Sequence, residues 1–140
     1  MKVDNLMTPR VVSVHLDDSL AQVHDIFKNT HFHHLLVVEN GRLRGVVSDR
    51  DLFKALSPHI GTPGETLRDR ATLNKRVHQI MSRNPITLET GADVFDAVAL
   101  LNEHTISCIP IVTAEGKVAG ILTWRDLLKG LEARRKQKSS

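Results

Sequence analysis

Two short stretches of the chain each pair a hydroxyl with a carboxylate three residues later, Ser48 with Asp51 and Thr123 with Asp126. Each pair follows an apolar strand pattern and opens a helix pattern, so it fits a capping box that satisfies free backbone N–H groups. The same junction also suits a ligand. A helix N-terminus attracts phosphate, and a carboxylate can accept both hydroxyls of a ribose. A single copy favours the cap, but two copies within a longer repeat give the ligand interpretation more weight.

Other residues of the chain could suggest catalysis or metal binding. His31 and His33 would share one face of a strand while His34 points away, and no acidic or cysteine partner lies close in the sequence. Cys108 is the single cysteine, and a small semi-buried thiol is a simpler account of it than a nucleophile. We therefore predict no metal site, no catalytic residues and no enzymatic activity.

Length and composition indicate one compact domain or two small halves that share a core. The chain has 140 residues, of which 41% are hydrophobic and 4% aromatic, so the core must be aliphatic. The apolar runs are too short to span a bilayer, and the N-terminus shows no signal-peptide pattern. A single cysteine excludes an internal disulfide. We expect a cytoplasmic protein without membrane insertion.

The net charge of +3 comes mainly from the C-terminus, where one acid, Glu132, opposes four basic residues. We predict a flexible basic tail at 132–140. The rest of the chain is close to neutral, which argues against nucleic-acid binding. One alternative stays open, a polyanion or nucleic-acid binder that uses the tail and a basic linker. The basic residues concerned are Arg68, Arg70, Lys75, Arg76, Arg134, Arg135, Lys136 and Lys138.

The chain contains an internal repeat. Val3 matches Val77 at an offset of 74, and after one added residue in a turn the Ser48 and Asp51 junction matches its counterpart at an offset of 75. Each copy predicts strand, helix, strand, strand and helix, with Ser19 and Asp93 as N-caps and Asn40-Gly41 as a hairpin turn. The predicted elements are 12–14, 20–27, 35–38, 44–48 and 49–56, then 86–88, 94–101, 109–112, 118–123 and 124–132.

A sheet covered by helices on one face leaves its other face bare, so we expect the two copies to pack sheet against sheet. The predicted fold class is α+β, made of two β-α-β-β-α repeats.

The repeat resembles a tandem pair of CBS domains, the adenine-nucleotide-sensing module named after cystathionine β-synthase. Two patterns carry the resemblance over residues 3–130. They are Gly-apolar-apolar-Ser/Thr-x-x-Asp at the end of each copy and Val-x-x-apolar-Met-Ser/Thr at its start. The resemblance implies packing about a pseudo-two-fold axis in a stand-alone Bateman-type module. It places CBS repeat 1 at 1–56, a linker at 57–76, CBS repeat 2 at 77–131 and the tail at 132–140.

The resemblance also implies ligand clefts between the sheets that take AMP, ADP, ATP or S-adenosylmethionine. Apolar side chains and backbone amides would hold the adenine, while hydroxyl and carboxylate hold the ribose and phosphate. Because His33 and His34 would stand where the other cleft has Ser107 and Cys108, we rank the Thr123/Asp126 cleft as the better nucleotide site. One cleft would combine Ser48 and Asp51 with Ile86, Ile106, Ser107 and Cys108, and the other Thr123 and Asp126 with Val12, Phe32, His33 and His34.

The function implied is a non-enzymatic regulatory module without a catalytic cofactor. It would bind an adenine nucleotide, form a homodimer and signal to a regulated protein that the sequence does not identify. A second interpretation is a scaffold or protein-interaction module whose clefts stay empty.

Overall fold

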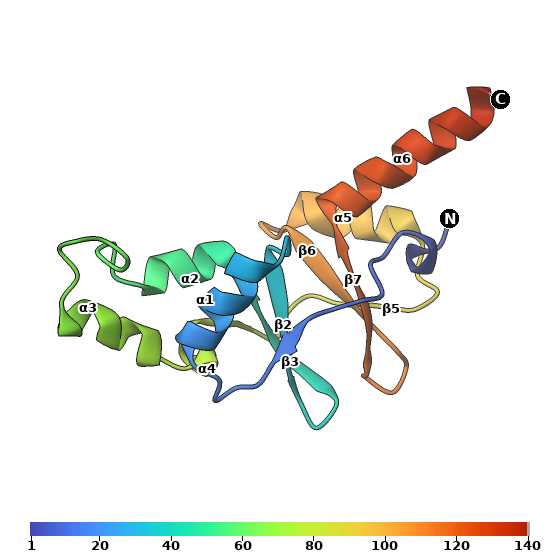
Figure 1. Ribbon diagram of the computed structural model, residues 1–140. Coiled ribbons are helices and arrows are strands. Elements are labelled where there is room, and N and C mark those ends of the chain that lie inside the picture. The colour runs from blue at the N-terminus through green and yellow to red at the C-terminus, as the bar shows by residue number, and fades with distance from the viewer. Residues whose placement is uncertain (140) are drawn as a thin grey trace. The chain divides into compact units, whose positions relative to one another are not determined.

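The computed structural model describes residues 1–139 as two compact units, each with its own small β-sheet and helices (Figure 1). We call Val12–Asn84 the Asp51 unit. The Asp126 unit combines Met1–Val11 with the chain from Pro85 onward. The predicted α+β class is confirmed.

The Asp51 unit holds a four-stranded sheet in the order β1-β2-β3-β4. Strand β1 is parallel to β2, and the other two pairs are antiparallel. Asn40 (φ 52°) and Gly41 (φ 78°) form the predicted tight turn between β2 and β3. Its elements are β1 (Ser13–Val14), α1 (Leu20–Asn29), β2 (His34–Glu39), β3 (Arg42–Ser48), α2 (Asp49–Ala55), α3 (Leu67–Ala71), η2 (Thr72–Asn74), α4 (Val77–Ile80) and β4 (Ser82–Arg83).

The Asp126 unit repeats this plan with a three-stranded sheet in the order β5-β6-β7. Strand β5 is parallel to β6, and β6 is antiparallel to β7. The predicted succession of strand, helix, strand, strand and helix is therefore confirmed in both units. The elements are η1 (Val3–Asn5), β5 (Leu88–Glu89), α5 (Val94–Glu103), β6 (Cys108–Val112), β7 (Val118–Thr123) and α6 (Trp124–Ser139).

Local capping explains where the first helix of each unit begins. Ser19 and Gln22 form a capping box, in which the Gln22 side chain accepts the Ser19 N–H at 2.8 Å. Asp93 accepts the Phe95 N–H at 2.8 Å. Both N-caps were predicted from the sequence.

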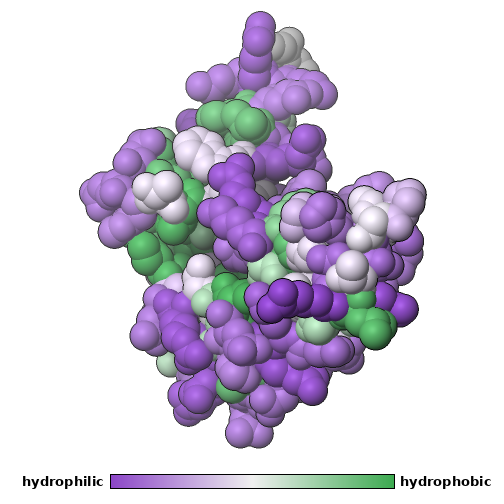
Figure 2. Space-filling view, turned by 90° about the vertical axis from the view of Figure 1, so that its left-hand side faces the viewer, coloured by the Kyte–Doolittle hydropathy of each residue, from purple (hydrophilic) through white to green (hydrophobic). Residues whose placement is uncertain are grey.

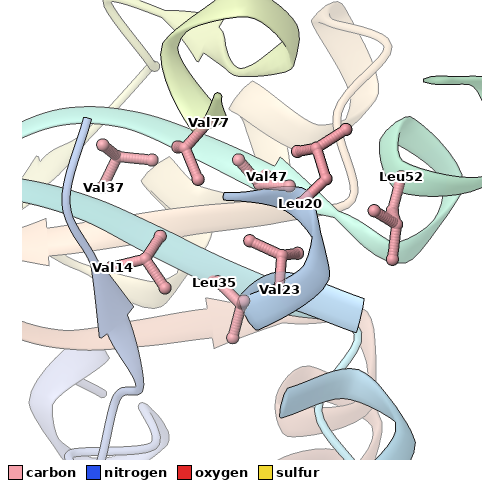
Figure 3. Close-up of a cluster of buried hydrophobic side chains, with 8 residues drawn as sticks. All are labelled: Val14, Leu20, Val23, Leu35, Val37, Val47, Leu52 and Val77. Atoms are coloured by element: carbon pink, nitrogen blue, oxygen red, sulfur yellow. The ribbon is translucent and has the colours of Figure 1, made fainter. Parts of the chain in front are cut away.

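Each unit has its own aliphatic core. In the Asp51 unit the side chains of β1, β2, β3 and the surrounding helices converge between sheet and helices (Figure 3). That cluster consists of Val14, Leu20, Val23, Leu35, Val37, Val47, Leu52 and Val77. The core of the Asp126 unit consists of Val3, Ala97, Leu101, Ile109, Ile111, Leu122 and Leu127.

The opening segment of each repeat packs on the body of the other repeat. Val77, which opens the second repeat, is fully buried in the Asp51 unit, and its N–H donates to Asp18 O at 2.9 Å. Val3, which opens the first repeat, is fully buried in the Asp126 unit, where its N–H donates to Ala92 O at 2.9 Å. The packing units thus cross the boundaries of the sequence repeats.

Two glycines allow these segments to approach the sheets. A Cβ at Gly45 would lie 2.6 Å from the carbonyl oxygen of Ser82, and one at Gly120 would lie 2.8 Å from that of Thr8. Strand β4 pairs with β3 beside Gly45, and Thr8 bridges Ile121 beside Gly120. The opening segment therefore extends one edge of each sheet.

The C-terminal region differs from the sequence prediction. We expected the last helix to end near Glu132 and a flexible tail to follow, but α6 continues to Ser139. Residues 132–138 are mostly good helix formers, and Lys136 pairs with Glu132 at 2.9 Å, one turn earlier. Residue 140 lies outside the described residues. None of the helices within residues 1–139 has the length and apolar character that a membrane crossing requires.

The linker region is also more ordered than a plain loop. Helix α3 begins at a capping box of Thr66 and Asp69, and the Ser57 hydroxyl donates to Asp69 Oδ1 at 2.7 Å. The hydrogen bond from Ser57 and that from the Thr66 N–H hold the pKa of Asp69 below its ordinary value. Two short helical pieces, η2 and α4, follow α3.

Candidate functional site

The first hydroxyl–carboxylate pair lies where β3 ends and α2 begins. Asp51 Oδ2 accepts the Ser48 N–H at 2.9 Å, and Ser48 Oγ accepts the Asp51 N–H at 3.0 Å. The predicted capping box is confirmed. Both residues are half-buried, and within residues 1–139 no hydrogen bond reaches Asp51 Oδ1. That oxygen is available to a further donor.

The second pair, between β7 and α6, has the same cap and two further contacts. Asp126 Oδ2 accepts the Thr123 N–H at 2.9 Å and the Thr123 hydroxyl at 3.1 Å. Asp126 Oδ1 accepts a third hydrogen bond, from the hydroxyl of Thr8 at 3.1 Å. Thr8 was not among the residues predicted for the site. The sequence signal that could have identified Thr8 is its position in the Met-Ser/Thr pattern that opens the repeat.

The strand register brings His34, Cys108 and Val12 to the end of their sheet where the motif lies. His34 lies opposite Ser48 in the β2–β3 pair, and Cys108 lies opposite Thr123 in the β6–β7 pair. Val12 O accepts the Leu36 N–H at 3.1 Å, which places Val12 at that end too. The Asp51 unit contains Val12, Phe32, His33, His34, Ser48 and Asp51, and the Asp126 unit contains Ile86, Ile106, Ser107, Cys108, Thr123 and Asp126. The implied pairing of each borrowed set with the motif of the opposite repeat stays a prediction.

The two histidines beside this junction have different environments. His33 Nδ1 lies 2.8 Å from Asp49 Oδ2 in an exposed pair. Burial lowers the pKa of the half-buried His34 below its ordinary value of 6.5, although the charges of Asp49 and Asp51 oppose this effect. His34 is therefore mainly uncharged at neutral pH.

Cys108 is buried, and burial raises the pKa of its thiol to about 12. The thiolate, which is the nucleophilic form, is negligibly populated at neutral pH. Among residues 1–139 no three His, Cys, Asp or Glu side chains gather as a metal-binding group, the histidines at 31–34 included.

A cavity of about 420 Å³ lies within the Asp51 unit beside the α2 junction. Phe32 and His33 line it together with Asp49, so two of the predicted ligand residues border an open hollow. Phe27, Leu52 and Phe53 also line it, and the sequence did not single out these three for a site.

Comparison with protein families identifies this arrangement of motifs and sheets. The CBS domain family matches residues 3–58 and 77–133, which together make up most of the chain. The chain belongs to the CBS domain family. A CBS domain-containing protein of Dictyostelium discoideum is 32% identical over 128 residues, covering 90% of this chain and 88% of its own length. The magnesium transporter MgtE of Thermus thermophilus is 31% identical over 134 residues, which cover 91% of this chain and 26% of that longer protein.

Solved structures of CBS proteins share the fold. CBSX2 in complex with AMP is 27% identical, with a TM-score of 0.79 and coverage of 96% of this chain and 98% of CBSX2. The cytosolic domain of the Mg²⁺ channel MgtE in complex with ATP is also 27% identical, with a TM-score of 0.69 and coverage of 88% and 46%. The CBS domain pair of MJ0100, in complex with 5′-methylthioadenosine and S-adenosylmethionine, has a TM-score of 0.78 at 23% identity and coverage of 96% and 98%.

Proposed function

We propose that this CBS protein is a non-enzymatic regulatory module that binds an adenosine-containing ligand and reports the binding state to a partner protein. The observation that carries the proposal is the repeated junction. In each unit a half-buried hydroxyl and carboxylate lie at the end of the sheet where His34 or Cys108 also lies. The candidate ligands are AMP, ADP, ATP and S-adenosylmethionine.

The chemistry of the junction fits a nucleoside. A carboxylate oxygen is a strong acceptor for the two hydroxyls of a ribose, and Asp51 Oδ1 is free of hydrogen bonds within residues 1–139. The predicted set also includes apolar side chains, such as Val12 and Phe32, that suit the faces of an adenine ring. The proposed ligand residues are the full predicted set: Ser48, Asp51, Thr123, Asp126, Val12, Phe32, His33, His34, Ile86, Ile106, Ser107 and Cys108.

Two relatives above 25% identity support the ligand class. CBSX2 carries AMP and the cytosolic domain of MgtE carries ATP, and both have the fold of this chain. Their ligands share the adenosine moiety, so adenosine is the common element that we transfer to this protein. A ligand that prefers one arrangement of the module shifts the population toward that arrangement, which is how a partner would sense it.

Exposed apolar side chains on the helices of both units support a protein partner, and we propose a homodimer as the first such assembly. Phe53 on α2 is 71% exposed, and Leu128 and Leu131 on α6 are 61% and 66% exposed. On the face drawn in Figure 2, hydrophobic patches interrupt a mainly hydrophilic surface. Exposed apolar surface of this kind commonly marks an interaction site.

We place the protein in the cytoplasm, where a chain with one buried free thiol is stable without disulfides.

Thermal unfolding with each ligand tests the proposal. A ligand at 100 times its Kd stabilises the native protein by about 2.7 kcal/mol, so AMP, ADP, ATP or S-adenosylmethionine should raise the Tm while GMP does not. Asp51→Asn and Asp126→Asn should reduce the shift, because the amide keeps a capping oxygen but loses the charge. Asp17→Asn is the matched control, since that side chain is 93% exposed. A Tm unchanged by all four ligands would favour the scaffold interpretation.

A further inference from the structure

The two CBS motifs have matching sequences, but their carboxylates have different hydrogen-bond partners. At the second motif, the hydroxyl of Thr8 also contacts the carboxylate. Thr8 Oγ1 donates to Asp126 Oδ1 at 3.1 Å. Thr8 is fixed beside β7 by two backbone hydrogen bonds to Ile121, of 2.8 and 3.0 Å. Ser82 occupies the equivalent place beside Val46, yet within residues 1–139 no hydrogen bond joins it to Asp51. Ser82 is exposed, whereas Thr8 is half-buried.

This contact uses the oxygen that a ligand would need. Asp126 Oδ2 already accepts two hydrogen bonds from Thr123 as part of the cap, so Oδ1 is the oxygen left over. The Thr8 hydroxyl occupies it from within the same unit. Threonine is branched at Cβ and its χ1 is restricted, and its backbone is tied to a strand, so the hydroxyl cannot simply turn away.

We propose that Thr8 is a specificity-determining residue that competes with a ribose hydroxyl for Asp126 and so makes the Asp51 motif the tighter of the two sites. The inference rests on the proposed function. A ligand held by Asp126 finds one acceptor position of Oδ1 already taken by the Thr8 hydroxyl, whereas a ligand held by Asp51 finds both positions of Oδ1 open. One protein then responds to two ranges of ligand concentration through two motifs that look alike in sequence.

His33 and His34 do not make the Asp126 site the tighter of the two. The sequence ranked the Thr123/Asp126 site higher because of His33 and His34. The structure pairs His33 with Asp49 at 2.8 Å, and His34 is half-buried and mainly uncharged at neutral pH. Neither side chain offers an unpaired positive charge to a phosphate. The ranking therefore depends on the carboxylates, which differ in the Thr8 contact at Oδ1 and in the hydrogen bond that the Thr123 hydroxyl donates to Oδ2 of Asp126.

Filling the Asp126 site also has a structural consequence. The hydrogen bond of Thr8 ties the amino-terminal segment Met1–Val11 to helix α6. When this hydrogen bond is lost, the backbone bonds to Ile121 still hold the segment on β7. The Thr8 side chain then no longer connects the segment to α6. Occupancy of the weaker site is thus reported to the amino-terminal segment.

Isothermal titration with AMP and, in parallel, ATP tests the inference. In an Asp51→Asn background only the Asp126 motif binds through its carboxylate. Thr8→Val keeps the branched shape and removes the hydroxyl, so it should tighten binding about threefold to tenfold, the worth of one hydrogen bond. Thr8→Ser keeps the hydroxyl and should leave the affinity within twofold. The matched control is Ser82→Val in an Asp126→Asn background, which should change nothing.

The outcomes separate the two proposals. If the wild-type protein binds AMP or ATP but Thr8→Val leaves the affinity unchanged or weakens it, Thr8 does not compete and the inference is overturned alone. If AMP, ADP, ATP and S-adenosylmethionine all fail to bind the wild-type protein, the proposed function is overturned and the inference with it. Each variant is first checked for a Tm close to wild type, and Thr8→Ala serves in place of Thr8→Val if the valine variant unfolds. Alanine also removes the hydroxyl, so it must tighten binding, and no change counts against the inference.

Discussion

Replacing Gly45 by alanine probes the contact that completes the sheet of the Asp51 unit. The new Cβ would lie 2.6 Å from Ser82 O and 2.8 Å from Met81 Sδ. A carbon and a carbonyl oxygen normally stay about 3.3 Å apart, so β4 must move by roughly 0.7 Å. Overpacking of this kind costs about 1–3 kcal/mol, and the lower entropy of the unfolded alanine chain offsets about 0.4–1 kcal/mol. We expect a net loss of about 1–2 kcal/mol.

Urea denaturation measures this loss. With a slope of about 2 kcal/mol per M, in the middle of the usual range, the midpoint of unfolding should fall by roughly 0.5–1 M. Gly64→Ala is the matched control. A Cβ there meets only Thr62 Oγ1 at 3.9 Å and the backbone has no positive φ, so the midpoint should stay equal or rise slightly. Equal midpoints for Gly45→Ala and Gly64→Ala would show that β4 does not approach β3 as closely as described.

Three further predictions concern the junctions and the residues beside them. Ser48→Ala and Thr123→Ala should each lower the free energy of unfolding by about 1 kcal/mol through loss of a cap, and unchanged urea midpoints would contradict the capping geometry. Burial lowers the pKa of His34, so its contribution to stability is complete above pH 6.5 and is lost as the pH falls through the folded pKa. His34→Asn should therefore flatten the decline of Tm between pH 7.5 and 5.5, and parallel profiles for the two proteins would refute this. Cys108, with a pKa raised to about 12 and a buried side chain, should react with a thiol reagent far more slowly in the native protein than in urea, which a colorimetric thiol assay follows. Equal rates would show that the thiol is accessible.

The sequence predicted most secondary elements because their signals are local. Ser19, Asp93 and the Ser48 junction are caps, and a cap depends on residues within one turn of the helix. The hairpin turn at Asn40-Gly41 needs two residues that tolerate positive φ, and these residue types do so at little cost. The predicted end of α6 was wrong. The prediction assigned the charged residues at 132–138 to a flexible tail, whereas these residue types are good helix formers.

The sequence by itself determined the repeat, the order of the elements and the identity of the hydroxyl–carboxylate pairs, because periodic and closely spaced residues carry that information. Only the tertiary structure decided which unit each opening segment joins and which oxygen of each carboxylate remains open. Val3 and Val77 are the same residue type, so the sequence does not show which core each one enters. The contact of Thr8 with Asp126 joins residues that are 118 positions apart. Such contacts form when the chain closes on itself, since their geometry depends on packing between distant segments that no local pattern encodes.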